Sequence, residues 1–270
     1  MSRIADKFVQ LRATGRKGFI PFVTAGDPDL PTSLEVVLAL AENDADIIEL
    51  GVPFSDPMAD GPTIQASSQR ALETGVGLAH ILQMVRKLRT ETDVPIVLFS
   101  YLNPLYRYGF DQLAANAAEA GIDGVLVTDV VDEEAAAISA VLRTHGIDLI
   151  SLIAPTTTDE RLEKIAARSS GFLYAVSRTG VTGAQNETSD AAEVLVNRAR
   201  RFTDLPIGVG FGISTPQQIA DVWRYADAAV VGSAIVKEIE MSIPSANTVE
   251  RVRKFVAGLV PEVAKEMVDI

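Results

Sequence analysis

The sequence predicts an α/β protein built as a single (β/α)₈ barrel, a TIM barrel, with one extra helix at its N-terminus. Eight short apolar segments rich in valine and isoleucine recur along the 270 residues, as in parallel strands covered on both faces. Helix-like stretches separate these segments. No Pro/Ser-rich linker or low-complexity tract interrupts the alternation, so residues 1–270 are interpreted as one domain. An open doubly wound sheet is the disfavoured alternative.

The elements follow in order from an amphipathic helix over residues 2–14, in which Ile4, Phe8 and Leu11 recur at helical spacing. The expected strands are Phe19–Thr24, Ile47–Val52, Pro95–Tyr101, Gly124–Asp129, Asp148–Ala154, Phe172–Ser177, Pro206–Gly210 and Ala228–Val231. The expected helices are Thr32–Asn43, Thr63–Thr74, Leu78–Glu91, Phe110–Ala120, Glu133–His145, Thr158–Arg168, Ala191–Phe202, Pro216–Tyr225, Val236–Ile239 and Val249–Val268.

Composition narrows the class of function. The formal net charge of -12 argues against nucleic acid and anionic membranes as partners. The absence of cysteine excludes disulfides and thiolate chemistry, and it fits a cytoplasmic protein. No signal-peptide core or membrane-spanning apolar run is expected. His80 and His145 lie in helix-like surface segments, so neither a histidine-based triad nor a metal site is predicted.

The carboxyl ends of the strands are where a barrel of this kind places its functional groups. The loops after the second and sixth strands, residues 53–62 and 178–188, are the longest at this rim and are candidate lids. Gly212, Gly232 and Ser233 follow the last two strands, where backbone N–H groups and a helix N-terminus bind phosphate well. Gly183 is placed to close over the same group.

Glu49 lies in the middle of an apolar strand, where an unpaired charge is costly. Strand alternation places it on the inward face with Ile47 and Gly51. It is therefore either salt-bridged inside the barrel or functional, and apolar walls would raise its pKa into a range that suits proton exchange. Asp60 and Asp56 follow on the loop. One of them can accept a hydrogen bond from a substrate, and Asp56 is the better candidate for a turn-stabilising role.

Five aromatic residues are expected at the same rim: Phe22, Phe54, Tyr101, Tyr174 and Phe211. Each taken alone is best explained by core packing, but together they indicate a flat apolar substrate body. The residues thus predict a phosphorylated small molecule with an apolar part, handled by carboxylates without a metal. They do not identify the bond that breaks.

Several motifs resemble, in order and spacing, those of the tryptophan synthase alpha chain family over nearly the whole length of the chain. The matching segments are residues 21–28, 49–65, 101–104, 177–183, 210–214 and 232–236, and the most specific is ELGVPFSDPMADGPTIQ at 49–65. The resemblance implies retro-aldol cleavage of indole-3-glycerol phosphate to indole and glyceraldehyde 3-phosphate.

The resemblance also implies roles for individual residues. Glu49 would be the general acid/base that protonates the indole carbon, Asp60 would hold the indole N–H, and Tyr174 would lie at the active site. The substrate pocket would be formed by Phe22, Ile64 and Phe211, with Thr182 on the closing loop that positions Asp60. The phosphate would be bound by Gly183, Gly212, Gly232 and Ser233.

The resemblance further implies an α2β2 assembly with a beta chain that carries pyridoxal phosphate and receives the indole. No cofactor is assigned to this chain. Residues 53–60 and the Asn103–Pro104 segment would face the beta chain. The fourth strand ends in Val-Thr-Asp-Val-Val at 127–131, unlike many relatives, but Asp129 remains, so the loop rather than the chemistry differs.

Three alternatives stay open. A stand-alone lyase would release free indole and would turn over well without a beta chain. A different phosphate-binding barrel, such as a sugar-phosphate isomerase, would not need Glu49 and Asp60 beside an apolar pocket. A non-catalytic regulatory partner would not need to keep Glu49, Asp60 and Tyr174 together.

Overall fold

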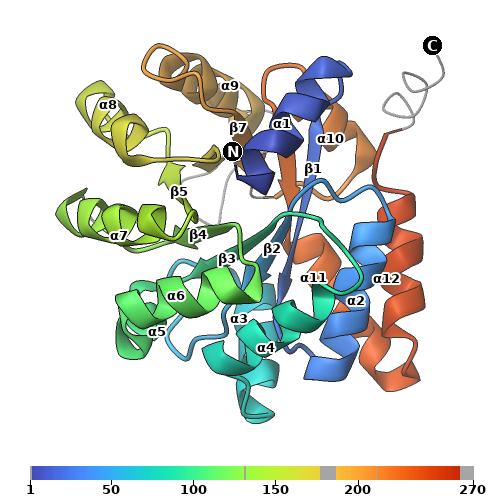
Figure 1. Cartoon of the computed structure of the whole chain (residues 1–270). Helices are drawn as coiled ribbons and strands as arrows, with labels where there is room; N and C mark the ends of the chain where they lie inside the picture. The colour runs from blue at the N-terminus through green and yellow to red at the C-terminus, as the bar shows by residue number, and fades with distance from the viewer. Residues whose placement is uncertain (1, 131, 177–186, 211, 262–270) are drawn as a thin grey trace.

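A closed barrel of eight parallel strands organises the chain, as a computed structural model that describes residues 2–130, 132–176, 187–210 and 212–261 shows (Figure 1). The strands pair in chain order and β8 returns to β1. Their bounds are β1 Gly18–Thr24, β2 Ile48–Gly51, β3 Ile96–Ser100, β4 Gly124–Val127, β5 Asp148–Ile153, β6 Leu173–Val176, β7 Ile207–Gly210 and β8 Ala228–Val231. The predicted (β/α)₈ barrel is confirmed, and every expected strand is present.

Helices surround the barrel, and one precedes it as predicted. Their bounds are α1 Arg3–Ala13, α2 Leu30–Glu42, α3 Pro62–Glu73, α4 Leu78–Leu88, α5 Leu102–Tyr108, α6 Phe110–Ala120, α7 Asp132–Thr144, α8 Asp159–Arg168, α9 Glu187–Ala199, α10 Pro216–Trp223, α11 Ser233–Ser242 and α12 Thr248–Ala257, with a 3₁₀ turn at Ile243–Ser245. No helix within the described ranges is long and apolar enough to cross a membrane.

Helix α5 differs from the sequence-based expectation, which placed only a loop after β3. Pro104 lies in its first turn, where a missing N–H costs little. The Asp129 carboxylate accepts a hydrogen bond from the Leu102 N–H at 2.6 Å, which satisfies one of the first donors of the helix. Several other bounds also differ. Helix α9 begins at Glu187 rather than Ala191, α11 begins at Ser233 rather than Val236, and α12 ends at Ala257, followed by Gly258 as its C-cap.

The core has an inner and an outer layer. Inside the barrel lie alternate strand residues, among them Ile20, Ile47, Val97, Ile150 and Phe172. Ile48 and Leu50, on the other face of β2, pack under the helices. This alternation fixes which side chains of each strand reach the barrel interior.

Helix α1 closes the end of the barrel where the strands begin. Its apolar residues Ile4, Phe8 and Leu11 join the inner layer of the core. Arg3 pairs with Asp123, which precedes β4, at 2.9 Å, and Lys7 pairs with Asp46, which precedes β2, at 3.7 Å. The opposite end, where the strands finish, is therefore the end left for a substrate.

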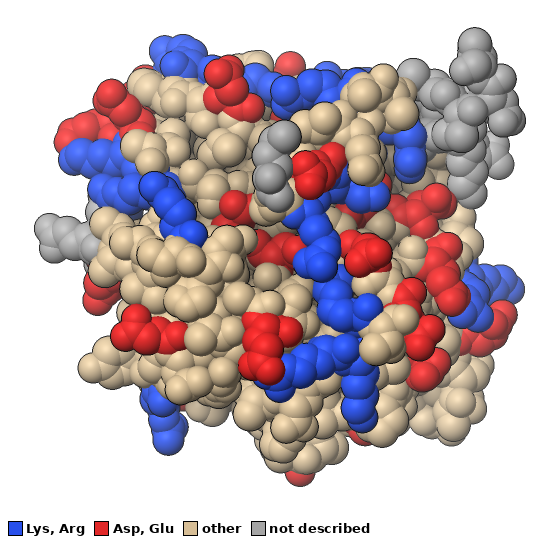
Figure 2. All heavy atoms as spheres, viewed as in Figure 1, with Lys and Arg blue, Asp and Glu red and all other residues tan. Residues whose placement is uncertain are grey.

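Surface charge is mixed on the face that Figure 2 shows. Basic side chains gather along the upper edge and in a band through the middle of this face, and acidic side chains lie beside them.

Candidate active site

Glu49 lies inside the barrel on β2, between Phe22 of β1 and Val97 of β3 in the strand register. The residue is fully buried, and neither carboxylate oxygen has a hydrogen-bond partner within the described ranges. Burial raises the pKa of Glu49 to about 8. The inward orientation expected from strand alternation is confirmed, and no described side chain forms the salt bridge of the alternative interpretation.

Tyr174 on β6 faces the same interior. Burial, together with the charge of Glu49, raises the pKa of Tyr174 well above its usual value, so the phenol stays protonated. Gly210, at the end of β7, lies against the Tyr174 hydroxyl so closely that a Cβ atom there would overlap it. The structure thus brings Glu49 and Tyr174 to the same part of the barrel.

Asp60 lies on the loop between β2 and α3, and its carboxylate is partly exposed. A hydrogen bond joins it to the Tyr101 hydroxyl, which also accepts from the Ala59 N–H at 2.9 Å. Burial raises the pKa of Asp60 to about 6, and the hydrogen bond from Tyr101 opposes that rise. Tyr101, which the sequence placed at the rim without a role, therefore holds the end of the loop between β2 and α3.

Asp56 lies exposed on the same loop, and its carboxylate accepts a hydrogen bond from the Ser55 hydroxyl at 2.6 Å. Its carbonyl accepts from the Met58 N–H at 2.9 Å. These local bonds fit the turn-stabilising role expected for Asp56.

An aromatic wall stands beside Glu49. Phe22 packs with Ile64 of α3 and Val236 of α11 in one small cluster that Phe99 of β3 borders. The Phe22 and Phe99 rings meet edge to face at 5.3 Å, and Phe99 and Tyr174 do so at 6.4 Å. Phe99 was missed as a site residue. Its place two residues after the inward Val97 was the signal that could have found it.

The expected phosphate site lies at the end of β8. Gly232 precedes α11 as its N-cap, and Ser233 is the exposed first residue of that helix, whose first N–H groups have no acceptor within the helix. Gly212 has a φ of 79°, a conformation that favours glycine. A Cβ atom on Gly232 would lie 3.4 Å from the Phe22 Cβ, so the aromatic wall and the phosphate site adjoin.

Three predicted site residues, Thr182, Gly183 and Phe211, lie outside the described residues. Among the residues that are described, no group of three or more His, Asp or Glu side chains is placed to hold a metal ion.

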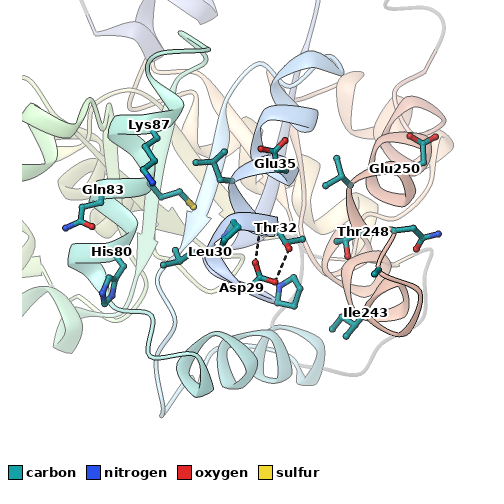
Figure 3. Close-up of a pocket in the computed structure, with 17 residues that line it drawn as sticks. Asp29, Leu30, Thr32, Glu35, His80, Gln83, Lys87, Ile243, Thr248 and Glu250 are labelled. Carbon is teal, nitrogen blue, oxygen red and sulfur yellow. Dashed lines mark hydrogen bonds between the residues drawn. The ribbon is translucent and has the colours of Figure 1, made fainter.

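A separate hollow of about 940 Å³ lies on the outside of the barrel between α2, α4 and the start of α12 (Figure 3). Asp29 there accepts hydrogen bonds from the Thr32 N–H and hydroxyl at 2.8 and 2.9 Å, so it caps α2. The hollow contains none of the predicted site residues.

Comparison with known proteins gives one consistent result. The family model described as tryptophan synthase alpha chain matches residues 8–264. The tryptophan synthase alpha chain of Citrifermentans bemidjiense is 50% identical over 265 residues, which cover 98% of this chain and 99% of the relative. That of Geobacter sulfurreducens is 50% identical over 259 residues, covering 96% and 98%.

Solved structures agree with this result. The tryptophan synthase subunit alpha of Legionella pneumophila superposes with a TM-score of 0.89 at 33% identity, covering 100% of both chains. A chain of the tryptophan synthase a2b2 complex of Pyrococcus furiosus superposes with a TM-score of 0.84 at 42% identity, covering 90% of this chain and 97% of the other.

Proposed function

This chain belongs to the tryptophan synthase alpha chain family, and we propose that Glu49 and Asp60 perform its reaction, the retro-aldol cleavage of indole-3-glycerol phosphate. The products are indole and glyceraldehyde 3-phosphate, so the chain is a carbon–carbon lyase. The assignment of Glu49 as the general acid rests on one observation. Its carboxyl group is fully buried beside the aromatic wall and has no hydrogen-bond partner among the described residues.

Glu49 supplies the proton that the cleavage needs. With its pKa raised to about 8, it is mostly protonated near neutral pH and can give its proton to C3 of the indole ring. The glyceryl hydroxyl then loses its proton to the Glu49 carboxylate and becomes the aldehyde carbonyl. As the C–C bond breaks, its electron pair returns to the ring, so Glu49 ends the cycle protonated.

Asp60 stabilises the positive charge that the ring nitrogen carries after protonation at C3. With a pKa of about 6, it is mostly ionised near neutral pH and can accept a hydrogen bond from the indole N–H. The Tyr101 hydroxyl holds the Asp60 carboxylate in place, which avoids reorganisation during the reaction.

The remaining predicted residues bind the two ends of the substrate. Phe22 and Ile64, with Phe211, form the indole pocket. Tyr174 lies close enough to Glu49 for the Glu49 charge to raise its pKa. We assign phosphate binding to Gly212, Gly232, Ser233 and Gly183, and closure over the substrate to Thr182. The first turn of α11 supports this assignment, since helix N-termini favour anions.

The chain works with a tryptophan synthase beta chain in an α2β2 assembly, the arrangement of the Pyrococcus furiosus complex. Pyridoxal phosphate belongs to that partner, which uses the indole to make tryptophan, and this chain needs no cofactor of its own. We place the enzyme in the cytoplasm, in keeping with a chain that lacks cysteine.

A cleavage assay tests this proposal. The purified chain receives indole-3-glycerol phosphate, with and without a cognate beta chain, and release of glyceraldehyde 3-phosphate is followed. Slow cleavage that rises on adding the beta chain is expected, and Glu49→Gln should lower kcat by at least about a hundredfold.

Two results would change the assignment. Fast cleavage by the chain alone, without further activation, would identify the stand-alone lyase. Near-normal turnover in Glu49→Gln would remove Glu49 from the role of acid, and absence of cleavage in both conditions would reject the reaction itself.

A further inference from the structure

Three elements that hold different parts of the site meet at one arginine, Arg70 of α3. Its guanidinium forms two hydrogen bonds with the Asp27 carboxylate, at 2.7 and 2.9 Å, and a third with Glu240 of α11 at 3.3 Å. Asp27 follows β1, and its side chain is fully buried, whereas that of Glu240 is 45% exposed. A planar fork with five donors can join two carboxylates in this way, which a lysine cannot do.

The joined elements carry the two ends of the substrate site. Helix α3 follows Asp60 and bears Ile64 of the aromatic wall, and α11 begins at Ser233 of the phosphate site. The two helices pack against each other, and Ile64 and Val236 meet at Phe22. Arg70 thus links the same two helices about two turns further along, at Glu240 of α11.

Helix α3 is also fixed to β1 independently of Arg70. The buried hydroxyls of Thr24 and Ser67 lie 2.6 Å apart, and Ser67 donates to the Ile64 carbonyl at 2.8 Å. Toward α3, by contrast, α11 presents an apolar contact through Val236, and such contacts are not directional. The Arg70–Glu240 hydrogen bond therefore adds a directional link that orients α11 relative to α3.

We propose that Arg70 is a positioning residue: by holding α11 near its C-terminal end, at Glu240, it fixes the separation between the phosphate site at the start of that helix and the indole pocket. The inference rests on the proposed function, because it concerns a substrate with an apolar ring at one end and a phosphate at the other. A ligand that is bound at two points gains binding free energy from both only when the distance between the two subsites matches the distance between its two ends.

Binding measurements separate this role from a purely structural one. In a Glu49→Gln background, which prevents turnover, calorimetry gives the Kd of indole-3-glycerol phosphate, of indole and of glycerol 3-phosphate. Arg70→Met should raise the Kd of the whole substrate by about tenfold, while the Kd of each single-ended ligand changes by less than about twofold. If the substitution merely loosened the site, the binding of all three ligands would be weakened.

Two further variants keep the test decisive if Arg70→Met does not fold. Glu240→Ala removes only the link between Arg70 and α11. Because the Glu240 side chain is half-exposed, the barrel should stay folded, and the Kd of the substrate should rise by about threefold. Glu240→Gln keeps an acceptor oxygen and should restore most of that loss. Arg86→Met, which removes a surface pair with Glu119 on α4 and α6, is the matched control and should change nothing.

Each outcome has one meaning. Unchanged substrate binding in Arg70→Met and Glu240→Ala, or equal weakening of the whole substrate and both single-ended ligands, would overturn the positioning role. Failure of the Arg70-intact chain to bind indole-3-glycerol phosphate would instead reject the proposed function.

Discussion

At the level of single residues, the pKa values of Glu49 and Asp60 are both raised, but the proposed reaction needs the two carboxyl groups in opposite protonation states. Cleavage needs Glu49 protonated, so activity should fall as the pH rises through about 8, and it needs Asp60 ionised, so activity should fall as the pH drops through about 6. The pH profile of kcat/KM should therefore be bell-shaped between these values. Asp60→Asn should remove the acidic limb from the pH profile of the residual activity. If the kcat/KM of the unchanged chain did not decline up to a pH of about 9, the role given to Glu49 would be contradicted.

Burial of Glu49 also has a consequence for stability. Because its folded-state pKa of about 8 exceeds the unfolded value of 4.5, the folded state loses stability as the pH rises between these values. At about 1.4 kcal/mol per pKa unit, this residue alone should cost about 3 kcal/mol between pH values of about 5 and about 8.

Urea unfolding at the two pH values measures this cost. Glu49→Gln has no charge to bury, so its stability should decline less with pH than that of the unchanged chain. Glu35→Gln, at an exposed position on α2, serves as the control. Equal pH dependence in all three chains would mean that Glu49 is solvated in solution.

Tyr101 affects the other carboxyl group. Its hydrogen bond lowers the pKa of Asp60 against the effect of burial, so Tyr101→Phe should raise that pKa further. The acidic limb of the kcat/KM profile should move to higher pH, while the alkaline limb stays where it is. A uniform loss of activity without movement of the acidic limb would show that Tyr101 only packs, for example against Phe54, whose ring lies 5.3 Å away.

At the level of elements, the pairing of β6 with β7 restricts Gly210. A Cβ atom there would collide with the hydroxyl and the ring of Tyr174, so Gly210→Ala should destabilise the barrel by about 1–3 kcal/mol. In a Tyr174→Leu background the ring end is gone, and the same substitution should cost much less. Thermal unfolding of the four chains measures the interaction, and additive effects would mean that β7 shifts to avoid Tyr174.

The strands were predictable because their signal is local. Short runs of Val and Ile mark each strand, and the alternation of side chains within Ile47–Val52 was enough to predict that Glu49 points into the barrel. Helix α5 was not predictable in the same way, because its first turn is satisfied by Asp129, 27 residues further along the chain. A loop sequence became a helix through a tertiary contact.

At the level of the whole molecule, sequence motifs predicted the residues of the candidate site but not how its parts are joined. The Tyr101–Asp60 hydrogen bond joins β3 to the loop after β2, and Arg70 joins three elements, so both depend on the closed barrel. Phe99 was missed because, in an apolar strand, only its place two residues after the inward Val97 distinguishes it as a residue of the barrel interior. The interpretation of residues 1–270 as one domain, and the roles of Thr182, Gly183 and Phe211, stay predictions.

We expect two exposed apolar residues near the mouth of the barrel to contact the beta chain. Met58 on the loop between β2 and α3 is 93% exposed and Tyr106 on α5 is 72% exposed. Large exposed apolar side chains of this kind commonly mark protein interfaces. They lie in or beside the segments expected to face the beta chain. Tyr106→Asp should weaken beta-chain binding by at least about tenfold, because a charge would be buried at the interface.

Sedimentation of the mixed chains measures this loss, and the cleavage assay without beta chain serves as the internal reference. The rate of cleavage by the isolated Tyr106→Asp chain should stay within about twofold of normal, since Tyr106 lies on α5, outside the loop between β2 and α3. Val9→Asp makes the same kind of change at a 56% exposed site on α1, at the opposite end of the barrel, and should leave the assembly intact. If Val9→Asp disrupted the complex and Tyr106→Asp did not, the beta chain would dock at the closed end of the barrel, and indole would have no short path between the two sites.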